Sequence, residues 1–267
     1  AIERAVELAA SADAAVVVVG TTEEVESEGF DRASLALPGR QDELVRRVAW
    51  ANRRTAVVVN AGAPVLLPWA DAVPAVLLAW FPGQEFGHAL ADVLLGAAEP
   101  GGRLPTTWPA NEHGLPSIQP EQGVLAYTEG LFVGYRAYDR DGRAPLFPFG
   151  HGDGYTTWEY LAIEPQPTGP DLTVRVTVRN AGARPGREVV QVYAERPESA
   201  VERPPRALAG FALAEAGAGE EVTVEIAVAQ RALAHWTGDG WAVEPGPLIV
   251  AAGRSSRDLR LRTAVTL

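Results

Sequence analysis

The chain has 267 residues, of which 47% are hydrophobic and 21% are charged, so it can bury sizeable cores and is long enough for two domains. Its 34 acidic residues outnumber the 23 basic ones and give a net charge of -11, which argues against nucleic acid and against an anionic membrane as partners. The absence of cysteine excludes disulfides, thiolate metal sites and cysteine nucleophiles, and four dispersed histidines predict no metal site. We expect no cofactor.

No apolar run approaches the ~20 residues that cross a bilayer. Ala1 opens directly into a helical pattern, with no basic-then-apolar leader before it. The chain also contains no methionine and therefore no start residue. We expect it to be the later part of a longer polypeptide, and the sequence leaves its compartment open between secreted and cytoplasmic.

The first 116 residues alternate helical and strand patterns. Continuous apolar runs, which suit parallel strands covered on both faces, predict strands at 16–19, 55–60 and 75–80. Helical patterns are predicted over 1–12, from about Gly39, and from Phe86 to Gly96. This alternation with short connections predicts an α/β layered domain with a mainly parallel sheet over residues 1–116. We expect this domain to be incomplete at its N-terminus.

The three loops that follow the predicted strands contain Glu28, Gly62 and Gly83. They should gather at one edge of the sheet, because the carboxyl ends of parallel strands meet there and commonly carry ligands. The first loop holds four glutamates within residues 23–28; a solvated acidic loop is the plain alternative. It lacks the glycine pattern of a dinucleotide site, and its acidity does not suit phosphate.

The middle segment, residues 117–165, is predicted to be an aromatic-rich linker that wraps between domains. Loops lack ladder hydrogen bonds, so we expect the aromatic side chains to pin an irregular segment, with a stacking platform for a sugar ring as the alternative. These aromatics are Tyr127, Phe132, Tyr135, Tyr138, Phe147, Phe149, Tyr155, Trp158 and Tyr160.

The last segment, residues 166–267, changes to a period of two. Residues 172–178 and 221–226 alternate cleanly between apolar and polar side chains, and from Asp171 about seven short strands are separated by turns. This pattern predicts an all-β sandwich, and the missing cysteine pair favours a fibronectin type III-like domain over an immunoglobulin domain. It shows no catalytic constellation, so we expect it to brace the α/β domain.

Residues 26–32, Glu-Ser-Glu-Gly-Phe-Asp-Arg, and residues 35–41, Leu-Ala-Leu-Pro-Gly-Arg-Gln, resemble the signature of family 3 glycoside hydrolases of the β-glucosidase type. Further similar motifs stand at 82–87, 100–105, 133–138, 147–152, 180–186 and 191–193. One departure is Asp153-Gly154, where the family usually has Leu-Ser, and we expect little functional consequence from it.

The resemblance implies a three-part enzyme. A (β/α)8 barrel comes first and supplies an aspartate nucleophile, an α/β domain supplies a glutamate acid/base, and many members end in a fibronectin type III-like domain. This sequence resembles only the second and third parts. The barrel of the same protein is therefore the expected partner, and a sugar-binding PA14 module inserted before Ala1 is a further expectation.

The resemblance assigns the acid/base to Glu28, directly before Gly29, and Glu26 is its rival. In the retaining mechanism the acid/base and the nucleophile lie about 5–5.5 Å apart. Neighbouring glutamates supply the like charge that raises the pKa of a proton donor. We expect Asp31 and Arg32 to form an ion pair that orders the loop.

The resulting hypothesis is the C-terminal part of a retaining β-glycosidase. It is expected to be a β-glucosidase that acts on terminal non-reducing β-linked glucose, with a β-glucoside or a glycosylated small molecule as substrate. The chain alone is expected to be inactive, because no nucleophile motif is present. The alternative is a non-catalytic accessory or carbohydrate-binding fragment. An N-acetylglucosaminidase is disfavoured, since that branch generally takes its acid/base from the barrel.

Overall fold

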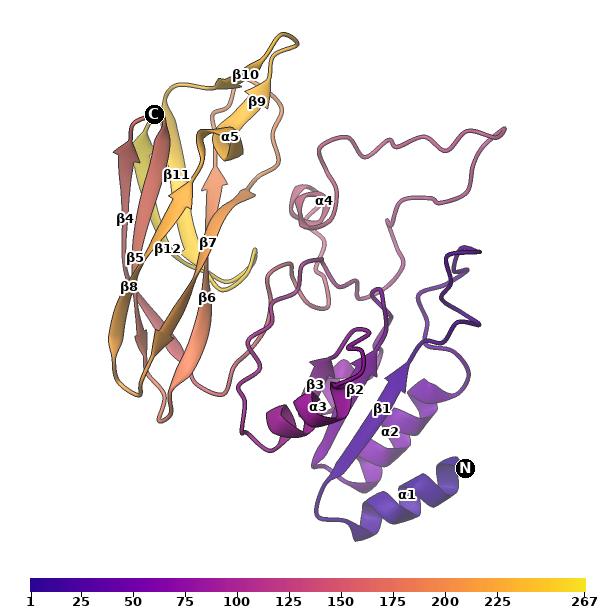
Figure 1. Cartoon of the computed structure of the whole chain (residues 1–267). Coiled ribbons are helices and arrows are strands. Elements are labelled where there is room, and N and C mark those ends of the chain that lie inside the picture. Colours follow the sequence, from indigo (N-terminus) through magenta and orange to yellow (C-terminus); the bar gives the residue numbers. More distant parts are fainter. The chain divides into compact units, whose positions relative to one another are not determined.

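The computed structural model describes all residues, Ala1–Leu267, and the chain forms two compact units (Figure 1). The first unit comprises residues 1–91 and 108–115, and the second comprises residues 92–107 and 116–267. None of the helices combines the length and the apolar character that crossing a membrane requires.

The first unit is built on a three-stranded sheet of order β1-β2-β3, in which both pairs of neighbours are parallel. Its elements are α1 (Ile2–Ser11), β1 (Ala15–Gly20), α2 (Gln41–Ala51), β2 (Thr55–Asn60), the short 3-10 helix η1 (Ala70–Ala72) and β3 (Ala75–Leu78). Helix α3 (Phe86–Leu94) begins in this unit and ends in the second. The parallel sheet confirms the strand prediction. Helix α1 packs against α2, and α2 packs on β1 and β2. A layered α/β domain requires helices packed on the sheet. Helix α3 has no buried residue, so the layered arrangement remains a prediction.

Burial distinguishes the central strand from the first strand. In β2, Val57, Val58 and Val59 are all buried, as expected for a strand covered on both faces. In β1, Val17 is buried, whereas Val16 and Val18 are 52% and 54% exposed. The expectation of a doubly covered strand is therefore correct for β2 and wrong for β1, because β1 lies at an edge of the sheet.

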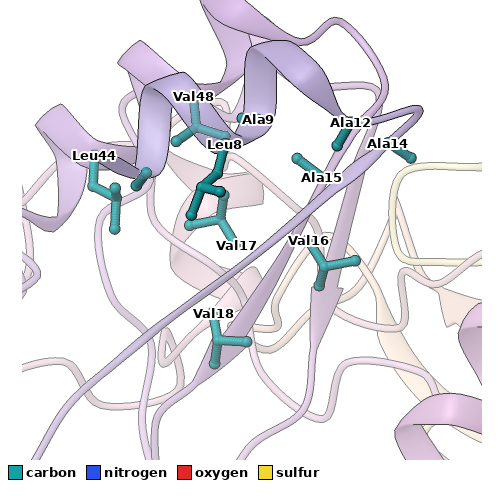
Figure 2. A pocket seen from close by; sticks show the side chains of 11 residues that line it. Leu8, Ala9, Ala12, Ala14, Ala15, Val16, Val17, Val18, Leu44 and Val48 are labelled. Atoms are coloured by element: carbon teal, nitrogen blue, oxygen red, sulfur yellow. The ribbon is translucent and has the colours of Figure 1, made fainter. Parts of the chain in front are cut away.

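An apolar groove follows this edge (Figure 2). It has a volume of about 370 Å³ and is formed by β1, α1 and α2. The lining residues are Ala5, Leu8, Ala9, Ala12, Ala14, Ala15, Val16, Val17, Val18, Leu44 and Val48.

The second unit contains two antiparallel sheets. The first, of order β4-β5-β8, consists of β4 (Trp158–Thr168), β5 (Asp171–Asn180) and β8 (Glu221–Val228). The second, of order β12-β11-β6-β7, consists of β12 (Leu259–Thr266), β11 (Pro247–Gly253), β6 (Gly186–Glu195) and β7 (Ala207–Ala216). The unit also contains α4 (Tyr135–Arg140), α5 (Gln230–Leu233) and a hairpin of β9 (Ala234–Trp236) and β10 (Trp241–Val243).

The two antiparallel sheets share one apolar core, in which Val174 and Val176 of β5 join Val190 and Val192 of β6. These residues occupy alternate positions along their strands, as the period-two pattern predicts. Strand β4 was not among the expected strands, although its 11 residues pair with β5. Most of β4 falls in the segment that was predicted to be an aromatic-rich linker. It contains two prolines, which this strand tolerates because it has no second neighbour and lies at an edge of its sheet.

Candidate functional site

The loops that follow β1, β2 and β3 meet at Gly62. A Cβ atom at Gly62 would lie 2.6 Å from Cε2 of Phe81 and 2.9 Å from Oε1 of Glu26. These residues belong to the three loops that were expected to gather at the carboxyl edge of the sheet. The structure confirms that expectation, and the absence of a side chain at Gly62 permits the close approach.

Glu26 links two of these loops. Its Oε2 accepts a hydrogen bond of 2.5 Å from Oγ1 of Thr21 and one of 3.2 Å from the backbone nitrogen of Gly62. Because these donors belong to the end of the β1 segment and to the loop after β2, the carboxylate fixes the path of the acidic loop.

Glu28 differs from Glu26 in its surroundings. It is exposed and has no hydrogen bond or ion pair within the chain. It occupies a tight turn in which Ser27 and Phe30 form an isolated β-bridge and Oγ of Ser27 accepts a hydrogen bond of 3.2 Å from the nitrogen of Gly29. The carboxylate of Glu28 is therefore open to an external ligand, while the backbone that carries it is locally constrained.

Arg32 does not form the ion pair that was expected with Asp31. Asp31 is exposed, and Nη1 of Arg32 instead donates to the carbonyl oxygen of Pro64 at 3.4 Å. Nη2 of Arg32 is buried and has no hydrogen-bond acceptor. The loop is ordered by a contact to the segment after β2, and the neighbouring aspartate takes no part in it.

Glu112 is a second anchor that the sequence analysis missed. Its Oε1 accepts hydrogen bonds from the nitrogen of Leu35 at 2.5 Å and from Oγ of Ser34 at 2.8 Å. These bonds, the backbone one first, hold the pKa of the Glu112 carboxyl below its usual value, with a smaller contribution from the charge of Arg32. The donors are more than 70 residues away along the chain, and no local pattern announces such a contact.

Gln41 determines where the acidic loop leaves the sheet. Its Oε1 accepts a hydrogen bond of 2.7 Å from the nitrogen of Gly20, and its Nε2 donates to the carbonyl oxygens of Gly20 at 2.9 Å and Pro38 at 3.0 Å. One side chain thus ties the end of β1 to the start of α2. This gives a physical role to the last residue of the motif at 35–41.

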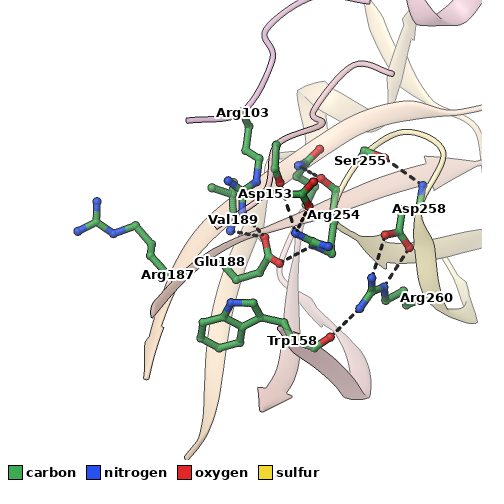
Figure 3. Close-up of polar contacts among 12 residues, drawn as sticks. Arg103, Asp153, Trp158, Arg187, Glu188, Val189, Arg254, Ser255, Asp258 and Arg260 are labelled. Carbon is green, nitrogen blue, oxygen red and sulfur yellow. Dashed lines mark hydrogen bonds and ion pairs between the residues drawn. The ribbon is translucent and has the colours of Figure 1, made fainter. Parts of the chain in front are cut away.

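A buried ion cluster lies in the second unit (Figure 3). The carboxylate of Glu188 is completely buried and pairs with Arg103 and Arg254, each at 2.8 Å. Arg254 also pairs with Asp153 at 2.9 Å, so the residue that departs from the family motif has a structural contact. The cluster fastens the segments around Arg103 and Asp153 to the sandwich, and we assign it a structural role.

The aromatic side chains of the middle segment include clear anchors. Tyr135 is buried, stacks on Phe149 with 4.8 Å between ring centroids, and meets Tyr193 edge to face at 6.3 Å. Its hydroxyl accepts a hydrogen bond of 2.9 Å from the nitrogen of Leu208. For Tyr135 and Phe149 this confirms the anchoring role. Tyr127, in contrast, is 86% exposed.

Comparison with protein families identifies the class of the chain. Residues 1–155 match the glycosyl hydrolase family 3 C-terminal domain, and residues 188–256 match the fibronectin type III-like domain. The chain belongs to glycosyl hydrolase family 3, and it carries the C-terminal domain of that family followed by a fibronectin type III-like domain.

Similar curated proteins are named as β-glucosidases. Thermostable beta-glucosidase B of Acetivibrio thermocellus is 41% identical over 99% of this chain and 36% of its own length. A beta-glucosidase of Rhizobium radiobacter is 41% identical over 100% of this chain and 34% of its own length. The chain therefore spans about a third of the length of these relatives.

Solved structures give the same result. DesR, a beta-glucosidase from Streptomyces venezuelae solved in complex with D-glucose, matches with a TM-score of 0.94 and 39% identity, over 100% of this chain and 35% of its own. The family 3 beta-glucosidase of Bifidobacterium adolescentis also matches with a TM-score of 0.94 and 39% identity, over 100% of this chain and 40% of its own.

Proposed function

We propose that this chain is the C-terminal part of a retaining β-glucosidase that hydrolyses terminal non-reducing β-linked glucose. In this proposal Glu28 is the general acid/base, and an N-terminal (β/α)8 barrel of the same protein carries the aspartate nucleophile. The observation that carries the proposal is the contrast within one loop, in which Glu28 is exposed and unpaired while Glu26 holds the loop in place.

The chemistry assigns Glu28 two successive tasks. Its carboxyl group protonates the glycosidic oxygen while the barrel aspartate attacks the anomeric carbon, and its carboxylate then removes a proton from the water that releases the sugar. The two carboxyl groups must approach to about 5–5.5 Å. Glu26, the rival, is less suited, because its Oε2 already accepts hydrogen bonds from Thr21 and Gly62 that it would have to give up.

The domain assignment, the substrate and the additional module in this proposal are those that the sequence predicts. Residues 1–116 carry the acid/base in a layered α/β domain, residues 117–165 link it to the next domain, and residues 166–267 form the bracing fibronectin type III-like domain. The substrate is a β-glucoside or a glycosylated small molecule. A PA14 insertion in the preceding polypeptide stays part of this proposal.

The test uses a chimera in which this chain replaces the matching third of the Acetivibrio thermocellus relative. Glu28→Gln and Glu28→Ala should cut turnover of substrates with poor leaving groups by about 10²–10⁴-fold, the usual contribution of general acid–base catalysis. Azide should rescue Glu28→Ala on an activated aryl β-glucoside, since a small nucleophile then replaces activated water. Glu7→Gln, an exposed position on α1 outside the acidic loop, is the matched control and should keep full activity.

Wild-type turnover in both Glu28 variants would refute the role of this residue. If the same loss and the same azide rescue occur in Glu26→Ala while Glu28→Ala stays active, the rival glutamate is the acid/base.

The alternative function is a non-catalytic accessory or carbohydrate-binding fragment. The absence of a nucleophile motif in these 267 residues favours it for the chain by itself. An assay of the isolated chain and of the chimera on the same aryl β-glucoside separates the two hypotheses. Turnover by the chimera and not by the isolated chain supports the proposal, whereas an inactive chimera together with glucose binding by the isolated chain supports the alternative.

A further inference from the structure

Two arginines of the second unit line a small pocket. Arg196 directly follows the last residue of β6, Arg203 lies before β7, and a proline follows each of them. Because the residue before a proline favours extended backbone, both side chains start from a backbone of restricted conformation. The pocket has a volume of about 40 Å³. Its other lining residues are apolar: Ala194, Pro204, Ala207, Ala232, Leu233 and Leu248.

The guanidinium group of Arg196 has unused donors. Its Nε and Nη2 atoms are buried and have no hydrogen-bond acceptor in the chain. These two nitrogens form one side of the planar group, which is the fork that binds an anion through two parallel hydrogen bonds. A buried donor without an acceptor is costly, so the fork favours an acceptor from outside the chain.

The acidic side chain near the pocket is already engaged. Glu244 pairs with Arg203, with 3.4 Å between Oε2 and Nε. Its oxygens also accept hydrogen bonds of 2.6 Å from the nitrogen of Ala200 and of 2.7 Å from Oγ of Ser199. These two bonds, the backbone one first, lower the pKa of Glu244 below its usual value, so the carboxylate is ionised and fixed. Two arginines therefore share one carboxylate, which leaves one positive charge without a partner.

His235 does not alter this balance of charge. Its Nδ1 lies 3.1 Å from Nη2 of Arg203. Because arginine has donors and no acceptor, this ring nitrogen accepts the hydrogen bond and carries no proton. Burial, followed by the charge of Arg203, lowers the pKa of Arg196 below its usual value. An anion beside Arg196 would offset both effects.

We propose that this pocket binds a small monovalent anion of the size of chloride. The anion accepts hydrogen bonds from Nε and Nη2 of Arg196, and Arg203 supplies a second positive charge. One water occupies ~30 Å³ in the liquid, so a pocket of about 40 Å³ admits a monatomic anion and excludes a sugar or a nucleotide. Its apolar walls favour a weakly hydrated halide over phosphate, because a charge loses hydration on burial.

The bound anion would tie the end of β6 to the segment before β7, within the fibronectin type III-like domain. Its expected consequence is stability that depends on chloride. The inference goes beyond the proposed function and depends neither on Glu28 nor on a barrel.

Crystals of the 267-residue chain grown in sodium bromide test the site directly, because the anomalous signal of bromide distinguishes a halide from water. We expect bromide within hydrogen-bond distance of Nε and Nη2 of Arg196. Thermal unfolding in sodium chloride and in sodium gluconate at equal ionic strength tests binding in solution, since gluconate is too large for the pocket. A ligand that binds only the folded state stabilises it, so the Tm should rise by about 3–5 °C for each tenfold increase in chloride above the Kd.

Arg196→Met separates the site from general effects of salt. Methionine has no charge and no donor, so replacing gluconate by chloride should no longer raise the Tm. In gluconate this variant should be at least as stable as the wild type, because a buried unpaired charge is gone, and that result excludes misfolding. Arg175→Met is the matched control, because the side chain of Arg175 on β5 is 49% exposed, and this variant should keep the chloride effect.

Three results would overturn the proposal. The first is a crystal without bromide at Arg196, whose donors then bind water. The second is an equal chloride effect in the wild type and in Arg196→Met, which would reduce any bromide in the crystal to binding at crystal concentration only. The third is loss of the chloride effect in the chimera, where a carboxylate of the remaining enzyme would then occupy the fork. Glu28→Gln should leave the chloride effect unchanged, so the two proposals can fail independently.

Discussion

Glu26 Oε2 lies 3.2 Å from the backbone nitrogen of Gly62, so a single carboxylate joins the loop after β1 to the loop after β2. The same oxygen accepts the hydroxyl proton of Thr21. The acidic loop therefore contains a glutamate that builds the loop and another, Glu28, that the loop presents to the outside.

Glu26→Ala is expected to loosen this junction. A hydrogen bond to a charged group contributes ~1.5–3 kcal/mol, so the amide of Gly62 should exchange at least about tenfold faster with solvent. Hydrogen exchange resolved to single residues measures this effect in the isolated chain. Glu23→Ala is the control, because Glu23 is exposed and lies in the same loop. Unchanged exchange at Gly62 in Glu26→Ala would contradict the structural role.

Gly62→Ala is expected to destabilise the first unit by overpacking. The new Cβ would lie 2.6 Å from the ring of Phe81 and 2.9 Å from Oε1 of Glu26. Because Phe81 is 58% exposed and can shift, the loss should lie at the lower end of the ~1–3 kcal/mol that overpacking costs in a core. Gly87→Ala is the control, because a Cβ at that position in α3 meets nothing within 4 Å and alanine is favoured in a helix. Denaturant unfolding followed by tryptophan fluorescence should show a lower midpoint for Gly62→Ala and an equal or higher midpoint for Gly87→Ala.

The sequence predicted that the three loops gather, because the pattern of apolar residues and the order of strands and helices along the chain require it. Three buried apolar runs separated by helices or short connections give a parallel sheet, and its carboxyl ends must meet. It could not predict that β1 would have one open side, because a continuous run of valines reads the same at an edge and at the centre. The difference depends on which strands are present as neighbours, and this is not a local property of β1.

The candidate site depends even more on contacts that the sequence does not reveal. Motif resemblance led to Glu28 and Glu26, but only the three-dimensional structure distinguishes a glutamate that accepts two hydrogen bonds from an exposed one. Glu112 was missed because its partners, Ser34 and Leu35, come from a distant segment. The expected pair of Asp31 and Arg32 was wrong for a related reason. Adjacent charges in a loop need not face each other, and Arg32 found a backbone carbonyl.

The anchoring of the loop at Glu112 should depend on pH. Hydrogen bonds from Leu35 and Ser34 lower the pKa of this carboxyl in the folded chain below the usual 4.5, so the folded state favours the ionised form. The resulting stabilisation is present above about pH 4.5 and is lost as the pH falls through the lower folded value. Exchange at the amide of Leu35, corrected for its intrinsic pH dependence, should therefore accelerate in this acidic window.

Glu112→Gln is the matched variant for that experiment. It removes the titrating group, so the corrected exchange of Leu35 should already be faster at neutral pH and should lack the acidic step. If wild type and Glu112→Gln show the same corrected profile, then Glu112 does not control the anchoring.

Loss of the charge of Glu188 should destabilise the second unit more than loss of an exposed ion pair. Glu188→Gln keeps the shape of the side chain but removes the charge that Arg103 and Arg254 share. Removing one partner of a buried ion pair leaves an uncompensated charge and costs ~3–5 kcal/mol. Glu215→Gln breaks the exposed pair with Arg187, whose side chains are 64% and 50% exposed, and such surface pairs contribute ~0–1 kcal/mol. Thermal unfolding should rank the two variants in that order. Equal losses would mean that Arg103 and Arg254 find other partners or water when Glu188 is neutral, and that the cluster is not the main fastening of the segments to the sandwich.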